Sequence, residues 1–292
     1  FDLPRPSPYF FTVMKIPAYV TKITSLLRRE GYQAWVVGGS IRDLLIGKQA
    51  SDFDVATDAR PERVLKLFRR TIPTGIKHGT VTVLMNGHSV EVTTFRVESD
   101  YSDARRPDRV SYASSIYDDL SRRDFTINGI AYDPSTDTLV DPYGGREDLQ
   151  RGIIRTIGDP AERFSEDGLR PFRACRFAAQ LQFTIEDRTF RAIPGCLSHA
   201  GQVSAERIRD EFIKILQSPQ PSTGIELLRK SGLITTFLPE LLSGYGIRQN
   251  KYHRYDIYYH NLYACDAADP SDYRVRLAAL LHDVGKYEAK RE

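Results

Sequence analysis

The first half of the chain alternates between helical and strand-like spacing of its apolar residues. Residues 16–30 place Val, Ile and Leu at helical intervals, which predicts an amphipathic helix. A second helix is expected to begin near Pro61, with a solvated basic face. Residues 80–84 and 89–95 alternate like two paired strands, with Asn86-Gly87 as the hairpin turn. The pattern therefore predicts a mixed or antiparallel sheet accompanied by helices.

The second half keeps only the helical spacing. Residues 164–183, 202–217 and 222–233 each place their apolar side chains along one side of a helix. The whole pattern predicts an α+β fold, in which a sheet-containing head precedes an all-helical neck and body. We expect four segments: 1–13 as a leader or extension before Met14, 14–145 as the head, 146–200 as the neck and 201–292 as the body.

Composition narrows the class of protein only a little. Apolar residues make up 41% of the chain and no run approaches the ~20 apolar residues of a membrane span, so no membrane association is expected. The net charge of +3 permits a local nucleic-acid-binding patch but does not argue for one. Cys175, Cys196 and Cys265 are far apart and lack CxxC spacing, which favours a reduced, cytoplasmic protein.

The densest candidate chemistry lies in residues 36–57, VVGGSIRDLLIGKQASDFDVAT. The pattern predicts a strand, a glycine turn, a short helix and a second strand that carries Asp52 and Asp54 on one face and Phe53 in the core. Two neighbouring carboxylates repel each other and call for a cation, and their oxygen atoms suit Mg²⁺. The alternative is that the two aspartates decorate a solvated strand end.

Three further residues join this candidate site. The glycine turn at Gly39 exposes backbone N–H groups, and Arg42 follows it closely, so the two are candidates for binding a triphosphate. Glu91, on the strand at 89–95, is a candidate third metal ligand, with a solvent-facing position as the alternative.

Residues 36–57 closely resemble the first signature of the nucleotidyltransferase superfamily, in the branch of bacterial-type tRNA nucleotidyltransferases (CCA-adding enzymes) and bacterial poly(A) polymerases. Residues 120–132, LSRRDFTINGIAY, nearly match the second signature of that branch. The resemblance implies that Arg123 and Asp124 contact the incoming nucleotide, and Asn128 is a candidate for its ribose hydroxyls. By spacing alone, the stretch predicts a helix capped by Ser121.

The sequence EDGLRPFRACRFA, at residues 166–178, resembles the third signature. Asp167 and Arg170, three apart on a helix, offer an acceptor and a donor fork, which together match the amino group and ring nitrogen that cytosine and adenine share. The alternative is an ordinary salt bridge on a helix surface. Arg173 and Arg176 are candidate nucleotide contacts through phosphate, and Pro171 predicts either a helix start near Asp167 or a kink.

Residues 98–108 are polar and aperiodic, which predicts a flexible loop. The resemblance implies a mobile loop at this place that takes part in the switch to adding A. The alternative is a surface loop without that role.

A last candidate site lies near the end of the chain. The His-Asp doublet of LAALLHDVGK, His282 and Asp283, together with the earlier His260, resembles the first part of an HD-domain phosphohydrolase site and is a possible second metal site. The further Asp of such sites is expected beyond residue 292, so we interpret the sequence as a fragment.

The resemblance implies a Mg²⁺-dependent enzyme that adds C and A nucleotides to a tRNA lacking its CCA end, from CTP and ATP and without a template, releasing pyrophosphate. An enzyme adding only CC or only A, or a poly(A) polymerase, is the nearest alternative. Alternatives from other classes are an HD metal-dependent phosphohydrolase and an inactive RNA-binding protein.

Overall fold

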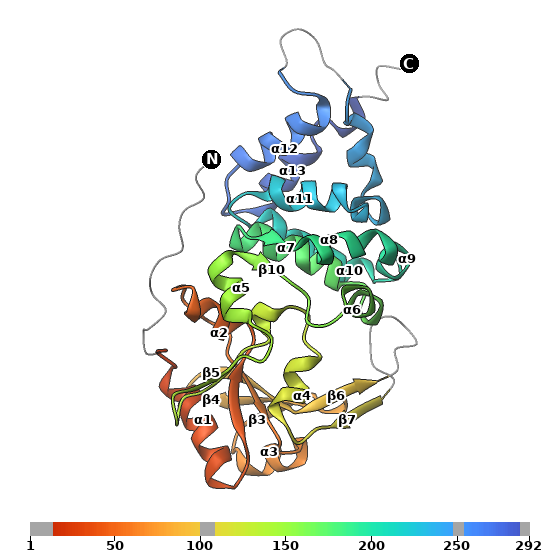
Figure 1. The fold of residues 1–292 in the computed structure, drawn as a ribbon. Coiled ribbons are helices and arrows are strands. Elements are labelled where there is room, and N and C mark those ends of the chain that lie inside the picture. The colour runs from red at the N-terminus through yellow and green to blue at the C-terminus, as the bar shows by residue number, and fades with distance from the viewer. Residues whose placement is uncertain (1–13, 100–108, 248–253, 287–292) are drawn as a thin grey trace. The chain divides into compact units, whose positions relative to one another are not determined.

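A computed structural model describes residues 14–99, 109–247 and 254–286. The described chain forms two compact units, which divide after Gly158 (Figure 1). The first unit contains the main sheet and the second is almost entirely helical, which confirms the predicted α+β fold. The first unit reaches beyond residue 145 because α5 (Gly145–Arg151) packs against the short 3₁₀ helix η2 (Thr126–Asn128). The functional boundaries at 145 and 200 stay predictions.

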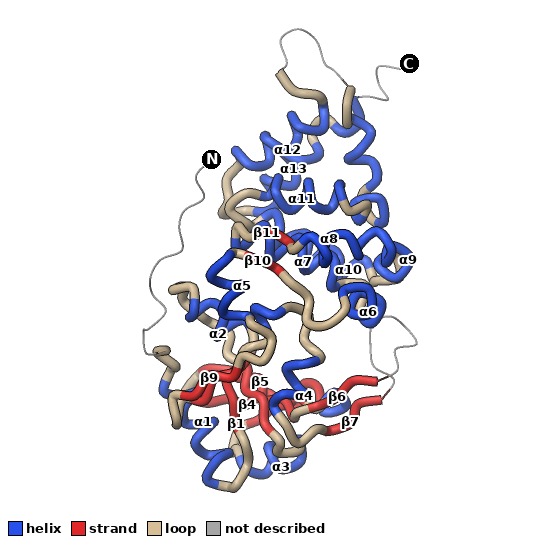
Figure 2. The backbone as a smooth tube through the Cα atoms, in the orientation of Figure 1, coloured by secondary structure: helices blue, strands red, loops and turns tan. Residues whose placement is uncertain are grey.

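The first unit is built on a seven-stranded mixed sheet, whose strands are red in Figure 2. Its strand order is β3-β4-β5-β2-β1-β8-β9, and β2 and β5 form a parallel pair while the other neighbours are antiparallel. The strands are β1 (Ala34–Val37), β2 (Asp54–Thr57), β3 (Thr71–Gly75), β4 (Thr80–Met85), β5 (His88–Thr94), β8 (Ala131–Asp133) and β9 (Thr138–Val140).

The predicted hairpin and helices of this unit are present. The turn residues Asn86 and Gly87 join β4 to β5 and both have positive φ, as a tight hairpin of this kind requires. Helix α1 (Ala18–Arg29) packs against β1 and β2, and α3 (Pro61–Leu67) packs against β4 and β5. Helix α2 (Gly39–Leu45) follows β1 directly.

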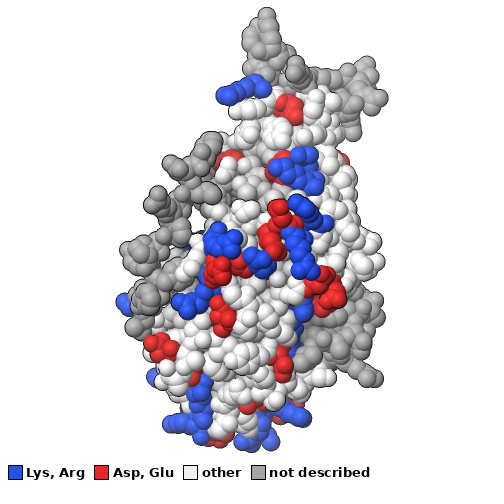
Figure 3. Space-filling model, in the orientation of Figure 1, with Lys and Arg blue, Asp and Glu red and all other residues white. Residues whose placement is uncertain are grey.

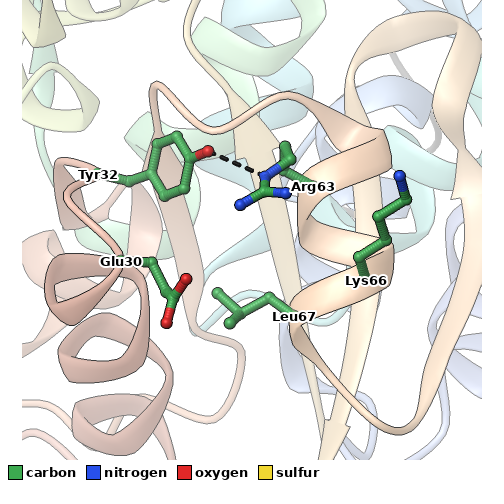
Figure 4. A pocket seen from close by; sticks show the side chains of 5 residues that line it. All are labelled: Glu30, Tyr32, Arg63, Lys66 and Leu67. Carbon is green, nitrogen blue, oxygen red and sulfur yellow. Dashed lines mark hydrogen bonds between the residues drawn. The ribbon is translucent and has the colours of Figure 1, made fainter.

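The basic face of α3 is exposed, as predicted. Figure 4 shows from close by a pocket between the end of α1 and α3, which part of this basic face lines. In this pocket the Arg63 Nε atom donates to the Tyr32 hydroxyl at 3.1 Å. Glu30 and Lys66 also line this pocket, so its charges are mixed. On the face of the molecule drawn in Figure 3, basic and acidic side chains are largely interspersed, in keeping with the small net charge.

Two sequence-based predictions of local structure are wrong. Residues 120–132 do not form one helix: Ser115 caps α4 (Ile116–Ser121), so Ser121 ends that helix instead of beginning one. The chain then extends, because Phe125 bridges Thr156 and the Thr126 N–H donates to the Arg155 carbonyl.

The second wrong prediction concerns the loop at 98–108. Its first residues belong to β6 (Arg96–Ser99), which pairs with β7 (Arg109–Tyr112) in a separate two-stranded ribbon. The prediction is therefore wrong for residues 98–99, whereas residues 100–108 lie outside the described part of the chain and leave the rest of the predicted loop untested.

The first unit ends with β10 (Ile153–Ile154), and helices pack on one another through the second unit. The predicted helix at 164–183 is two helices, α6 (Pro160–Glu166) and α7 (Arg170–Leu181), with Pro171 in the first turn of α7. The remaining elements are β11 (Thr184–Ile185), α8 (Asp187–Ala192), α9 (Leu197–Ala200), α10 (Ala205–Leu216), α11 (Pro221–Lys230), α12 (Ile257–Ala267) and α13 (Tyr273–Leu281).

Candidate active site

The sheet register brings two of the predicted carboxylates together. Asp54, the first residue of β2, lies directly beside Glu91 of β5 in the parallel pair. Residues in register on neighbouring strands point to the same face of a sheet, so both carboxylates share one side. Asp52 precedes the strand instead of lying on it, but Phe53 between the two aspartates is buried as predicted.

The carboxylate cluster carries excess negative charge. The pKa of Asp54 is raised to about 6, chiefly by burial and also by the negative charges of Glu91 and Asp52, against the opposing effect of Arg123. An aspartate whose neighbours resist its ionisation is a ready ligand for a cation, because a bound metal ion removes the repulsion. The donor set is entirely carboxylate oxygen, which suits Mg²⁺.

The glycine turn lies against this cluster. Val37, the last residue of β1, is in register with Asp54, so Gly38 follows beside the carboxylate. Gly38 adopts φ 78° and ψ −142°, which side chains rarely reach. A Cβ atom there would lie 3.2 Å from Arg123 Nη1 and 3.5 Å from Asp54 Oδ2, so three segments converge on this glycine.

If the site has the nucleotide-transfer activity that the resemblance implies, Gly38→Ala is expected to lower this activity more than tenfold, because the backbone strain and the displaced Arg123 both fall at the site. Steady-state rates measure the effect. Gly31→Ala is the matched control: Gly31 also has positive φ, of 86°, but a Cβ there meets no described atom within 4 Å. Equal activity loss in both variants would contradict the assignment.

A hydrogen bond between Arg42 and Asn128 connects helix α2 to the second motif, at residues 120–132. Arg42 Nη1 donates to the Asn128 side-chain oxygen at 2.9 Å, and Asn128 donates in turn to Asp124 at 2.9 Å. Arg42 also pairs with Asp43 at 2.8 Å. Asp124 and Asn128 are buried, so these predicted nucleotide contacts form a network inside the first unit. Gly39 is the first residue of α2, beside Arg42.

In the second unit, Asp167 lies in the break between α6 and α7, and Arg170 is the first residue of α7. Asp167 is extended and lies outside both helices, so the predicted placement on adjacent helical turns is wrong. Its carboxylate accepts from the Leu169 N–H at 3.0 Å and from Arg207 at 2.9 Å. Arg170 is buried, and its Nη1 donates to Glu166 and to the Arg163 carbonyl.

Arg176 points into the second unit. It is 7% exposed, pairs with the buried Glu211 of α10 and donates to Gln180 at 2.6 Å. This geometry gives Arg176 a packing role, whereas Arg173 is half-buried beside the Phe177 ring.

Arg176→Ala is expected to destabilise the second unit by about 2–4 kcal/mol, because it leaves the buried Glu211 charge with only the half-exposed Lys214 as its partner among the described residues. Urea unfolding measures the change. The double variant Arg176→Met with Glu211→Leu should recover most of the loss, since it removes both charges. A single variant as stable as the parent would contradict the expectation.

Several residues in these networks were missed by the sequence analysis, above all Asp119. This fully buried carboxylate binds both Arg122 and Arg123. Its position three and four residues before them is a usable signal, since such spacings face each other on a helix. Arg207 lies 40 residues from Asp167, and Glu211 lies 35 residues from Arg176, so no local pattern points to these two pairs.

His260, His282 and Asp283 gather as a candidate metal site. Their ligand atoms lie within 4.8 Å of one another, with 3.2 Å between the two histidine Nε2 atoms. Lys286 also binds Asp283 at 2.9 Å. Burial tends to raise the pKa of Asp283, but the Lys286 hydrogen bond and the nearby His282 charge lower it overall, so the carboxylate is kept ionised.

None of the helices in the described residues is both long and apolar enough to cross a membrane.

Comparisons with known proteins agree on one family. Residues 34–155 match the family described as "Poly A polymerase head domain", and residues 182–244 match "Probable RNA and SrmB- binding site of polymerase A". The chain is 48% identical over 219 residues to a CCA-adding enzyme of Geobacillus sp. (strain WCH70) and 46% identical over 207 residues to one of Lactobacillus johnsonii.

Those alignments include 75% and 71% of this chain but 54% and 52% of the two relatives, so the chain spans about half the length of the curated relatives it matches. Among solved structures, the Bacillus stearothermophilus CCA-adding enzyme in complex with CTP is similar with a TM-score of 0.77 and 36% identity. That match covers 91% of this chain and 62% of the other.

Proposed function

The chain belongs to the family of CCA-adding enzymes and poly(A) polymerases, and we propose that it adds C and A nucleotides to the 3′ end of tRNA from CTP and ATP. The names of the relatives, which are CCA-adding enzymes, support this proposal. The observation that carries the proposal is the convergence of Asp54, Glu91 and Arg123 beside Gly38.

In the proposed reaction the RNA 3′-oxygen forms a bond to the α-phosphorus of the nucleotide. The bond from that phosphorus to the pyrophosphate oxygen breaks, and the hydroxyl proton is lost. Asp52, Asp54 and Glu91 would hold Mg²⁺, which supplies charge stabilisation at the attacking and leaving oxygens when bound. Arg123 contributes a fixed positive charge next to these carboxylates, suited to orienting the triphosphate.

The second unit supplies base selection in this proposal. Asp167 lies in the break before α7 and Arg170 is the first residue of α7, so the carboxylate can accept from an amino group and the guanidinium can donate to a ring nitrogen. Their present partners, Arg207 and Glu166, hold the two side chains in place. Arg173 is the remaining candidate for a phosphate contact.

The three free cysteines of the chain are buried, which supports a cytoplasmic location for this activity.

The test is nucleotide addition to a tRNA transcript that lacks its CCA end. Labelled CTP and ATP, supplied separately and together with Mg²⁺, should give CC with CTP and CCA with both. An enzyme that adds CC but never A would be the CC-only alternative, and one that adds A only to a CC end would be the A-only alternative. A long A tail would identify a poly(A) polymerase. No addition of any nucleotide by the full-length protein would overturn the proposal.

The cluster of His260, His282 and Asp283 favours a second candidate function, a metal-dependent phosphohydrolase. Release of phosphate from 2′,3′-cyclic or other nucleotide substrates, measured with added divalent metal, tests it. Activity that survives Asp52→Asn but disappears in His282→Ala would establish this function separately from nucleotide addition.

A further inference from the structure

We propose that Asp119 is a positioning residue, which anchors Arg122 and Arg123 so that the free side of the Arg123 guanidinium points to the corner formed by Gly38 and Asp54. This inference rests on the proposed function, because it assigns Arg123 the nucleotide's phosphates as its ligand. Among the described residues, the Asp119 carboxylate binds Arg122 and Arg123, so it would act on the nucleotide through the arginine.

The contacts around Asp119 make it an anchor. Its Oδ1 accepts from Arg122 Nη2 at 2.6 Å and Nε at 3.1 Å, and its Oδ2 accepts from Arg123 Nη2 at 3.0 Å. The carboxylate is fully buried, and although burial tends to raise the pKa of Asp119, the two arginines lower it overall. A charged, buried group with this many bonds has little freedom to move.

The nitrogen atoms of Arg123 that Asp119 does not bind are the donors that could bind an anion. Its Nη1 lies at the Gly38 corner, and its buried Nε has no hydrogen-bond partner among the described residues. Among the described residues, Asp119 is the hydrogen-bond partner of Nη2. A part-buried guanidinium with a buried, unsatisfied Nε is costly to maintain, and an anion reaching this corner would give its donors a partner.

Geometry also explains why the anchor matters. Arg123 follows the end of α4 and lies just before the extended segment at Phe125, so no helix holds its side chain. Asp54 also interacts electrostatically with Arg123, so it would attract the guanidinium in the absence of Asp119. The guanidinium would then fold onto the carboxylate that is proposed to bind metal.

The experiment measures binding of CTP with Mg²⁺ by calorimetry in the full-length protein, for the parent, Asp119→Asn, Arg123→Ala and the double variant. Asp119→Asn keeps the shape and is expected to raise Kd about ten- to hundredfold, and KM more than it lowers kcat. In the Arg123→Ala background it should add less than about twofold, because the arginine it acts through is already gone. If the increases in Kd of the two single variants multiply in the double variant, the inference is overturned.

Asp148→Asn is the control, because Asp148 is another buried carboxylate of the first unit, bound to Thr126 and Arg155. It should lower thermal stability with Kd within about twofold of the parent. Arginine side-chain NMR supplies a readout without nucleotide: the hindered rotation of the Arg123 guanidinium should be lost in Asp119→Asn. Unchanged rotation would refute the anchor, whereas a parent that binds no nucleotide would refute the proposed function instead.

Discussion

Asp54→Asn is expected to lower kcat for nucleotide addition at least about a thousandfold, since a lost metal ligand removes several kcal/mol of transition-state stabilisation. The same substitution is expected to stabilise the metal-free protein at neutral pH. The Asp54 carboxylate lies beside Glu91 and its folded-state pKa is about 6, so ionising it in the folded protein lowers the free energy of unfolding.

The sign of the pH dependence follows from that raised pKa. Between about pH 4 and 6 the unfolded state has released the Asp54 proton while the folded state still binds it, so stability falls as pH rises through this window. Above pH 6 the loss is complete, and it is at most about 3 kcal/mol. Asparagine does not ionise, so the Asp54→Asn variant does not lose this stability as the pH rises.

Thermal unfolding in a metal chelator measures the difference. At pH 7.5 the variant should melt several degrees above the parent, at about 2–4 °C per kcal/mol for a unit of this size. At pH 4 the two should melt together, since Asp54 is then protonated in the folded parent. A variant that is less stable at pH 7.5, or that retains transfer activity, would refute the assignment of Asp54.

Asp167→Asn is expected to reduce the preference for CTP over UTP at least about a hundredfold. The carboxylate can only accept, so it matches the amino group of cytosine, while an amide also donates and can pair with the uracil carbonyl. Asparagine retains an acceptor for the Leu169 N–H, so the break between α6 and α7 should persist.

Misincorporation of UTP on a tRNA transcript, expressed as a ratio of kcat/KM values, measures this change. Asp210→Asn is the matched control in the same unit, because Asp210 is an exposed aspartate that pairs with its neighbour Arg209. Unchanged discrimination in Asp167→Asn would remove this residue from base selection and leave the metal assignment untouched.

Local patterns correctly predicted those elements whose causes lie close together in the chain. Helix α1 follows from apolar spacing, the β4–β5 hairpin from Asn86-Gly87, and the start of α3 from Pro61. The burial of Phe53 between two aspartates follows from the strand period. The gathering of His260, His282 and Asp283 was predicted only by resemblance, because local spacing does not show that two separate segments of the chain meet there.

By itself the sequence determined the α+β class, the family and the residue types available for chemistry, because apolar periods and motif spacings are local properties. Only the tertiary structure decided the rest: that β2 and β5 pair in parallel with Asp54 beside Glu91, that Phe125 is extended and bridges Thr156, and that Arg176 is buried against Glu211. Each of these depends on partners many residues apart, whose contact energies outweigh the weak local preference of the chain.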